Sequence, residues 1–206
     1  NIDKSPKISD AKKTQYKGEA HFLRGLYYFN LVRLFGDVPW IDKQQTASDD
    51  LQVSRTSKDI VYQHIIDDFS DAASMLPAVY ENTTDIGRAT KGAAFGLLAK
   101  VYLTLKRYNE TLVAIDSVMN LGVYSLNRKY EWNFSDLREN GPESLFEVQY
   151  EKDVTAYSEF DILGQGGWHH EYMAPLASIN IGGPWGNFGW FAVYPEFVES
   201  YEPGDL

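Results

Sequence analysis

Three tryptophans in a glycine-rich stretch carry the chemistry that this sequence indicates most directly. Trp168, Trp185 and Trp190 lie within residues 164–190, a span that holds 7 of the 16 glycines and 3 of the 5 tryptophans. The span has no helical or strand period, so we expect irregular loops that carry rigid rings. Sugars stack their C–H faces on aromatic rings and bond to nearby polar side chains. The pattern therefore predicts a saccharide-binding region.

Polar side chains beside these rings complete the predicted site. The predicted ligand-binding residues are Trp168, His169, Trp185, Asn187 and Trp190. The alternative is that the tryptophans fill space between loops and helices. We expect at least one of the three rings to face a ligand.

The other reactive side chains give no catalytic or metal-binding pattern. Glu159, Asp161 and Glu171 could supply a glycosidase carboxylate pair, but with 29 acidic residues such pairs arise by chance. His169 and His170 are adjacent and lack further ligands at zinc-site spacing. The chain has no cysteine, no nucleophile elbow and no phosphate-binding glycine loop. We expect a non-catalytic protein without cofactor or metal.

Composition narrows the class of protein further. With 44% apolar and 15% aromatic residues the chain should fold, and its net charge of −10 disfavours nucleic-acid binding. No apolar run reaches the roughly 20 residues that a membrane-spanning helix needs.

A long first helix is predicted from Ser9 or Asp10 to Phe35. It is apolar on almost every face from Ala20 onward, and Gly36 with the following Asp-Val-Pro ends it. We expect Arg24 and Arg33 to satisfy buried carbonyls or carboxylates. Core packing is expected for Tyr27, Tyr28, Phe29 and Tyr102, and the Trp40 ring should seal the following loop onto the core.

The second helix is predicted to begin at Thr56, with Asp59 completing an approximate capping box, and to end before Pro77. We interpret its acidic residues as a solvated face; they are Asp67, Asp68 and Asp71. A third and fourth helix, within residues 91–121, match the spacing of a tetratricopeptide repeat. The matching positions are Phe95, Leu98, Ala99, Tyr102, Tyr108, Ile115 and Val118.

The ends of these elements are predicted from single residues. Asn109 should cap the fourth helix and Gly122 should close it. Residues 140–142 read as a turn, residues 145–150 as a short strand, and residues 195–201 as a short terminal helix.

The chain resembles the SusD/RagB family of nutrient-binding outer-membrane lipoproteins. Four blocks carry the resemblance: residues 19–40 (EAHFLRGLYYFNLVRLFGDVPW), 91–126, 143–150 (ESLFEVQY) and 197–206 (FVESYEPGDL). The resemblance implies a mainly α fold, an α-α superhelix of tetratricopeptide-like pairs with a loop-rich insertion and a short strand. It implies one domain over residues 1–206, incomplete at both ends, with repeat helices in 1–122 and a loop-rich part in 123–206.

The same resemblance implies a function. We expect non-catalytic capture of an extracellular glycan at the cell surface and delivery to a SusC-like TonB-dependent transporter in the outer membrane. The lipid anchor would lie outside this sequence. Three alternatives stay open: a peptide-binding member of the family, a generic tetratricopeptide scaffold for protein–protein interaction, and a glycan-cleaving enzyme.

Overall fold

The structure is a computed structural model that describes residues 2–46, 52–134 and 138–149. Four α-helices make up most of the regular structure in these ranges. They are α1 (Asp10–Phe35), α2 (Lys58–Met75), α3 (Lys91–Thr104) and α4 (Tyr108–Met119). Short 3-10 helices span Ile2–Lys4, Thr83–Asp85 and Tyr130–Phe134. No strand occurs within these described ranges, where Val38 and Thr56 form an isolated antiparallel bridge. The mainly α fold class is confirmed.

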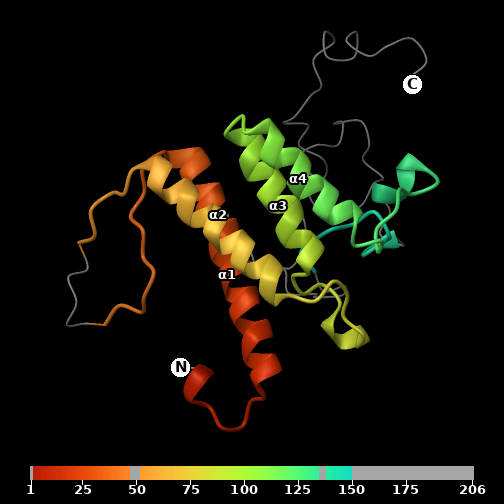
Figure 1. Cartoon of the computed structure of the whole chain (residues 1–206), viewed down its shortest axis with the longest axis horizontal. Helices are drawn as coiled ribbons and strands as arrows, with labels where there is room; N and C mark the ends of the chain where they lie inside the picture. The colour runs from red at the N-terminus through yellow and green to blue at the C-terminus, as the bar shows by residue number, and fades with distance from the viewer. Residues whose placement is uncertain (1, 47–51, 135–137, 150–206) are drawn as a thin grey trace, which may run out of the picture. The chain divides into compact units, whose positions relative to one another are not determined.

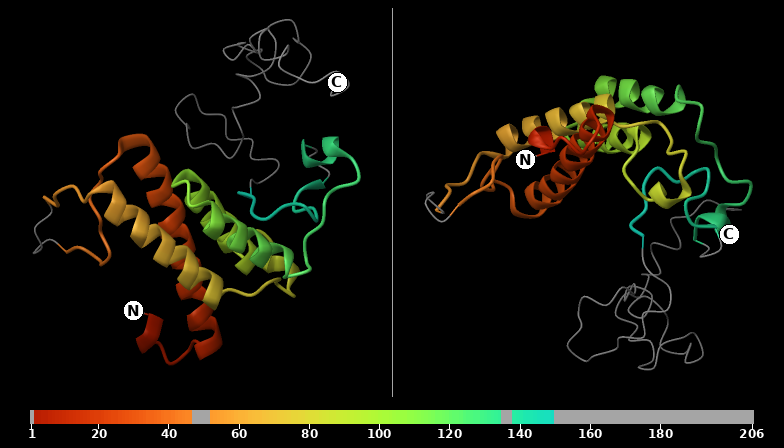
Figure 2. Two further views of the ribbon diagram at one scale, coloured as in Figure 1. Left: turned by 45° about the horizontal axis from the view of Figure 1, so that its top comes forward. Right: turned by 90° about the horizontal axis from the view of Figure 1, so that it is seen from below.

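The helices pack in chain order. α1 lies against α2, α2 against α3, and α3 against α4 (Figures 1 and 2). Contacts between Cα atoms divide the chain into residues 1–148 and 149–206, and the helices all belong to the first unit. The prediction of a single domain over residues 1–206 stays a prediction.

Phenylalanine rings make the centre of the α1–α2 contact. Phe22, Phe29 and Phe69 are at most 1% exposed, and Phe22 meets Phe69 edge to face with ring centroids 5.9 Å apart. A Cβ on Gly25 would stand 3.1 Å from the Phe69 ring, so the glycine lets the two helices approach closely. Burying each ring stabilises the fold by about 1.5–3 kcal/mol.

The outer face of α1 departs from the expectation of packing on all sides. Tyr27 is 64% exposed and Leu34 is 76% exposed, so the prediction of a core role for Tyr27 was wrong. Phe29 is buried, and Tyr28 and Tyr102 are partly buried against the core, as predicted. Apolar sequence alone could not distinguish the face that contacts α2 from the face that points outward.

The start of α2 also differs from the sequence prediction. Ser57 is the N-cap residue and makes no side-chain cap bond, whereas the Lys58 amide donates to Asp37 Oδ1 at 2.8 Å. Thr56 instead donates its amide to the Val38 carbonyl at 2.9 Å. The predicted Thr56 capping box was wrong because the loop returns and lets a residue beyond the end of α1 cap α2.

Two further helix-end predictions had different outcomes. Arg107, not Asn109, precedes α4, and Tyr108 at its first turn is 61% exposed. Gly122 adopts a left-handed φ of 66° just beyond the helix, as its predicted closing role requires. Ile115, a predicted repeat position, is exposed as well.

The segment after α4 contains the predicted turn but not the predicted strand. Ser144 donates its amide to the Gly141 carbonyl at 3.0 Å, and Asn140 has a φ of 54°, which confirms a turn at 140–142. Residues 145–149 belong to no strand, so the strand prediction was wrong for them. Leu145 packs on α3 and Phe146 on the helical core instead of joining a sheet, whereas Val148 is 63% exposed.

Candidate functional site

The predicted ligand-binding residues belong to the part of the chain beyond residue 149. Trp168, His169, Trp185, Asn187 and Trp190 all lie outside the described residues, and so do the predicted terminal helix and the carboxylates near residue 160. Their role stays a prediction. The described residues offer a different candidate, a cavity that sequence reasoning missed.

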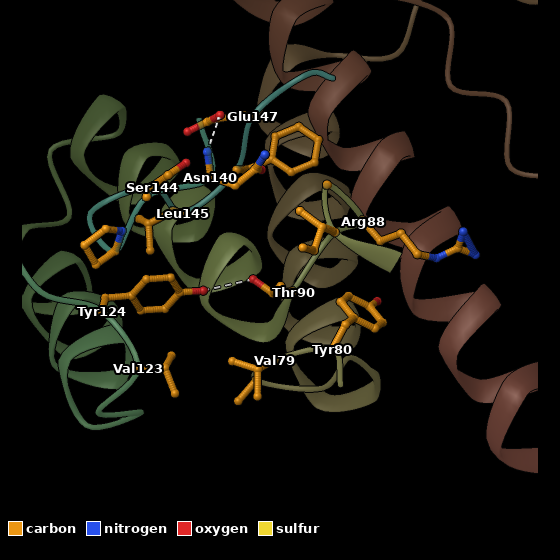
Figure 3. Close-up of a pocket in the computed structure, with 16 residues that line it drawn as sticks. Val79, Tyr80, Arg88, Thr90, Val123, Tyr124, Asn140, Ser144, Leu145 and Glu147 are labelled. Carbon is orange, nitrogen blue, oxygen red and sulfur yellow. Dashed lines mark hydrogen bonds between the residues drawn. The ribbon is translucent and has the colours of Figure 1, made fainter. Parts of the chain in front are cut away.

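This cavity lies beside the first turn of α3 and has a volume of about 260 Å³. Its walls come from the turn after α2, the start of α3, residues 123–124 and the segment 140–147 (Figure 3). Val79 and Val123 lie on one side, while Asn140, Ser144 and Glu147 lie across from them. Pockets for drug-sized ligands begin at about 300 Å³, so this cavity suits a single ring.

Two glycines on one face of α3 let two residues of the cavity wall, Tyr124 and Leu145, pack closely on this helix. Gly92 and Gly96 are four residues apart and so lie one above the other on the helix. A Cβ on Gly92 would overlap the Tyr124 ring, and one on Gly96 would come within 2.7 Å of Leu145 Cδ1. The irregular segment can therefore lie directly on the α3 backbone. Only the Gly-x-x-x-Gly spacing could have signalled this contact in the sequence.

A hydrogen-bond chain holds the ring wall in place. The Tyr124 hydroxyl lies 3.0 Å from Thr90 Oγ1 (Figure 3), and the same Oγ1 accepts from the Ala93 amide at 3.1 Å. Thr90 thus caps α3 and positions Tyr124 at once. Across the cavity the Asn140 amide donates to Glu147 Oε2 at 2.9 Å.

Tyr80 forms a second aromatic part of the cavity wall, and its hydroxyl is neutral. The Tyr80 hydroxyl donates to the Ala89 carbonyl at 2.8 Å, and burial, with Glu19 nearby, raises the pKa of Tyr80. The phenol therefore stays protonated and neutral at physiological pH. Arg88 extends away from the cavity toward α1, where its Nε donates to Glu19 at 3.0 Å (Figure 3).

The segment 140–147 is also anchored to the helical core. The Phe146 ring meets Phe22 edge to face with centroids 4.9 Å apart. The Ser125 amide donates to the Pro142 carbonyl at 2.9 Å, which ties the segment to the chain after α4. The result is an apolar, partly aromatic hollow edged by hydroxyl groups, an amide and one carboxylate. This arrangement suits a small neutral ligand that carries hydroxyls.

A second polar cluster, between α1 and α2, has a structural role. Asp68 is 2% exposed and accepts from Arg24 Nε at 2.8 Å and Nη2 at 2.6 Å, while His21 Nδ1 lies 2.7 Å from Asp68 Oδ1. The prediction that Arg24 would meet a buried carboxylate is confirmed, and the prediction that Asp68 would be solvated was wrong. A helix face read from sequence does not show which of two adjacent aspartates turns inward.

Trp40 seals the loop onto this cluster, as predicted. Its ring stacks on His64 with centroids 4.5 Å apart and planes 13° apart, and it lies 4.3 Å from Tyr28. The Arg24 guanidinium carbon lies 5.0 Å from the Trp40 ring centre. Arg33 bonds to the Phe29 carbonyl and to the side chain of Asn30, so part of its role is also as predicted.

The described residues contain neither a candidate metal site nor a candidate membrane-spanning helix. No group of three or more His, Cys, Asp or Glu side chains there could hold a metal ion, and no helix in the same ranges is long and apolar enough to cross a membrane.

The chain is similar in sequence and in fold to SusD-like proteins. The SusD-like family model, described as "Starch-binding associating with outer membrane", matches residues 1–103. A SusD-like protein of Formosa agariphila is 28% identical over 100% of this chain and 44% of its own length. A SusD superfamily structure from Parabacteroides distasonis covers 99% of this chain at 30% identity, with a TM-score of 0.83 and 42% of its own length.

A further solved relative is described by its ligand. A protein named a laminarin-binding SusD-like protein is 28% identical and covers 73% of this chain and 33% of its own length, with a TM-score of 0.66. The chain therefore spans less than half the length of these relatives.

Proposed function

This chain belongs to the SusD-like family, and from that premise we propose that the protein captures a glycan at the bacterial outer membrane without catalysing its cleavage. The observation that carries the proposal is the family match over residues 1–103, whose description names starch binding and association with the outer membrane. The laminarin-binding relative supports a glycan as the ligand class.

Within this chain we assign the binding of the sugar rings to the tryptophan-rich stretch. The rings of Trp168, Trp185 and Trp190 supply apolar planes, and His169 and Asn187 supply hydrogen bonds. The cavity beside α3 supports the proposal in a more limited way. It has several hydroxyl groups and one carboxylate in its walls but room for only one ring, so we assign it a supporting rather than a principal role.

The partner is also a proposal. A captured glycan has to enter the cell, and the family resemblance points to a SusC-like TonB-dependent transporter in the outer membrane. Co-purification of the tagged full-length protein from outer-membrane extracts should recover such a transporter. Recovery of the protein alone, under conditions that preserve other outer-membrane complexes, would contradict this partner.

A tryptophan replacement series tests the glycan site. We expect laminarin or starch oligosaccharides to bind the full-length protein, and at least one of Trp168→Ala, Trp185→Ala and Trp190→Ala to weaken binding about tenfold, because a stacked ring is lost. Isothermal titration calorimetry measures the affinity. Trp132→Ala is the matched control, since that ring packs on Arg138 in the described helical unit, 4.2 Å from its guanidinium carbon.

The results of this series distinguish an error in the tryptophan site from an error in the proposed glycan capture. Unchanged binding in all three variants would contradict the tryptophan assignment while leaving glycan capture intact. Binding of peptides but of no glycan would contradict glycan capture and favour the peptide-binding alternative.

A further inference from the structure

Three basic side chains line one cavity at the end of the helical layer where α1 and α3 end and α2 begins (Figure 1). They are Arg33 from α1, Lys58 from α2 and Lys106 after α3. The cavity has a volume of about 580 Å³, and Asp59 is the acidic residue in its lining. In a chain with a net charge of −10, such a concentration of positive charge needs an explanation.

Helix dipoles explain two of these cations but not the third. Arg33 lies in the last turn of α1 and Lys106 directly follows α3, positions where a positive charge is favourable. Lys58 is the first residue of α2, and a cation there opposes the dipole. The Asp37 carboxylate on the Lys58 amide and Asp59 in the lining offset part of this cost, and an anion bound in the cavity would offset more of it.

None of these three basic groups forms a salt bridge with a carboxylate of the described residues. Arg33 donates to the Phe29 carbonyl and to Asn30 Oδ1, both neutral acceptors. The ammonium groups of Lys58 and Lys106 form no salt bridge within the described ranges. Three cations face one cavity, with their donor capacity largely available.

The rest of the lining suits a saccharide more than a bare ion. Tyr62 contributes a half-buried ring whose pKa is raised by burial, so its hydroxyl is neutral, and Thr104 adds a second hydroxyl. Val32 and Leu105 supply apolar surface. A volume of about 580 Å³ lies inside the usual range of about 300–1,000 Å³ for small-ligand pockets.

We infer that this cavity is a second ligand site, which binds a short saccharide through an anionic substituent, a sulfate or a carboxylate. Lys58 and Lys106 bind the anion, while Tyr62 and Thr104 contact the sugar ring. The site is built from described residues alone. It is distinct from the tryptophan-rich stretch and does not depend on glycan capture there.

The test compares charged and neutral sugars on the full-length protein. Glucose-6-sulfate and glucuronate are titrated against glucose, with amide chemical shifts in a 15N-labelled sample as the readout. We expect at least one of the two anionic sugars to bind and to shift resonances around residues 58–62 and 104–106, and glucose to leave those resonances unchanged. The anionic sugar that binds identifies the substituent. Affinity should fall as sodium chloride is added, because salt screens exposed charges.

Charge-removing variants complete the test. Lys58→Gln and Lys106→Gln should each weaken binding about threefold or more, since each removes one charge-assisted contact. Lys100→Gln is the matched control, an exposed lysine on α3 outside the cavity, and it should leave the affinity unchanged. All three positions are exposed, so folding should persist, which thermal unfolding checks. Equal binding of glucose, no binding of either anion, or equal weakening by the control would each overturn the inference.

Discussion

Two contacts within the helical unit differ in how they are made: the contact between α1 and α2, and the contact between α3 and the irregular segment after α4. α1 and α2 meet through large side chains, with Asp68 buried between Arg24 and His21 and with phenylalanine rings beside it. α3 meets the irregular segment after α4 through the absence of side chains at Gly92 and Gly96. The first contact carries buried charge. The second consists of side chains packed on a bare helix backbone, and it lies beside the cavity of about 260 Å³.

Because of this difference, the two contacts are destabilised by opposite kinds of substitution. A contact between buried charged partners is damaged when a group is removed, because its partner stays desolvated and unpaired. A contact between a ring and a bare helix backbone is destabilised when atoms are added, because the ring or the backbone would have to move and lose hydrogen bonds. Removal and addition of atoms therefore probe the two regions separately.

Removal of the buried charge should have the largest effect. Asp68→Asn removes the buried carboxylate that Arg24 and His21 share. We expect the free energy of unfolding to fall by about 3 kcal/mol, the lower end for a broken buried ion pair, since Arg24 is 31% exposed and Asp71 remains 4.0 Å from His21 Nδ1. Urea denaturation measures the change. Asp67→Asn is the matched control, because the Asp67 side chain is exposed and accepts a hydrogen bond from Gln63 Nε2. A similar loss in both variants would show that the buried position does not matter.

Addition of one methyl group to α3 should have the next effect. Alanine normally favours a helix over glycine by about 0.5–1 kcal/mol. At Gly92, however, the new Cβ would overlap the Tyr124 ring, so we expect Gly92→Ala to lower stability by about 1–2 kcal/mol. The sign of the change in thermal or urea unfolding decides between propensity and overlap.

A double variant tests the cause of that loss. Combining Gly92→Ala with Tyr124→Ala removes the overlapping ring, so adding the methyl group in the Tyr124→Ala background should be neutral or stabilising. An equal loss in both backgrounds would mean that the added methyl group destabilises the helix itself and not its contact with Tyr124.

The sequence predicted the helices much better than the contacts between them. The sequence predicts the first helix from Ser9 or Asp10 to Phe35, and α1 spans Asp10–Phe35, because the signals that start and stop a helix are local. The cap of α2 was missed because its acceptor, Asp37, is 21 residues away from Lys58 in sequence. Asp68 was misplaced for the same reason, since its partners lie on another helix.

The candidate site was less accessible to prediction. The aromatic rings that composition indicates lie in residues 164–190, outside the described part of the chain. The cavity beside α3 depends on two glycines and on a tyrosine 32 residues after the first of them, a relation that no local pattern contains. Tyr108 shows the limit of repeat matching as well, because it fills the expected position in sequence and is nevertheless exposed.

Loss of one hydroxyl from the cavity wall should have the smallest effect of the three. Tyr124→Phe keeps the ring over Gly92 and removes only the bond to Thr90, whose Oγ1 still caps α3 by accepting from Ala93. We expect a loss of about 0.5–1 kcal/mol in urea denaturation, the usual net value of one hydrogen bond. Tyr108→Phe, at an exposed position, is the control and should change nothing. A loss from Tyr124→Phe as large as that from Gly92→Ala would mean that the hydrogen bond, and not the glycine contact, positions the ring. The second contact would then depend on polar pairing, as the α1–α2 contact does.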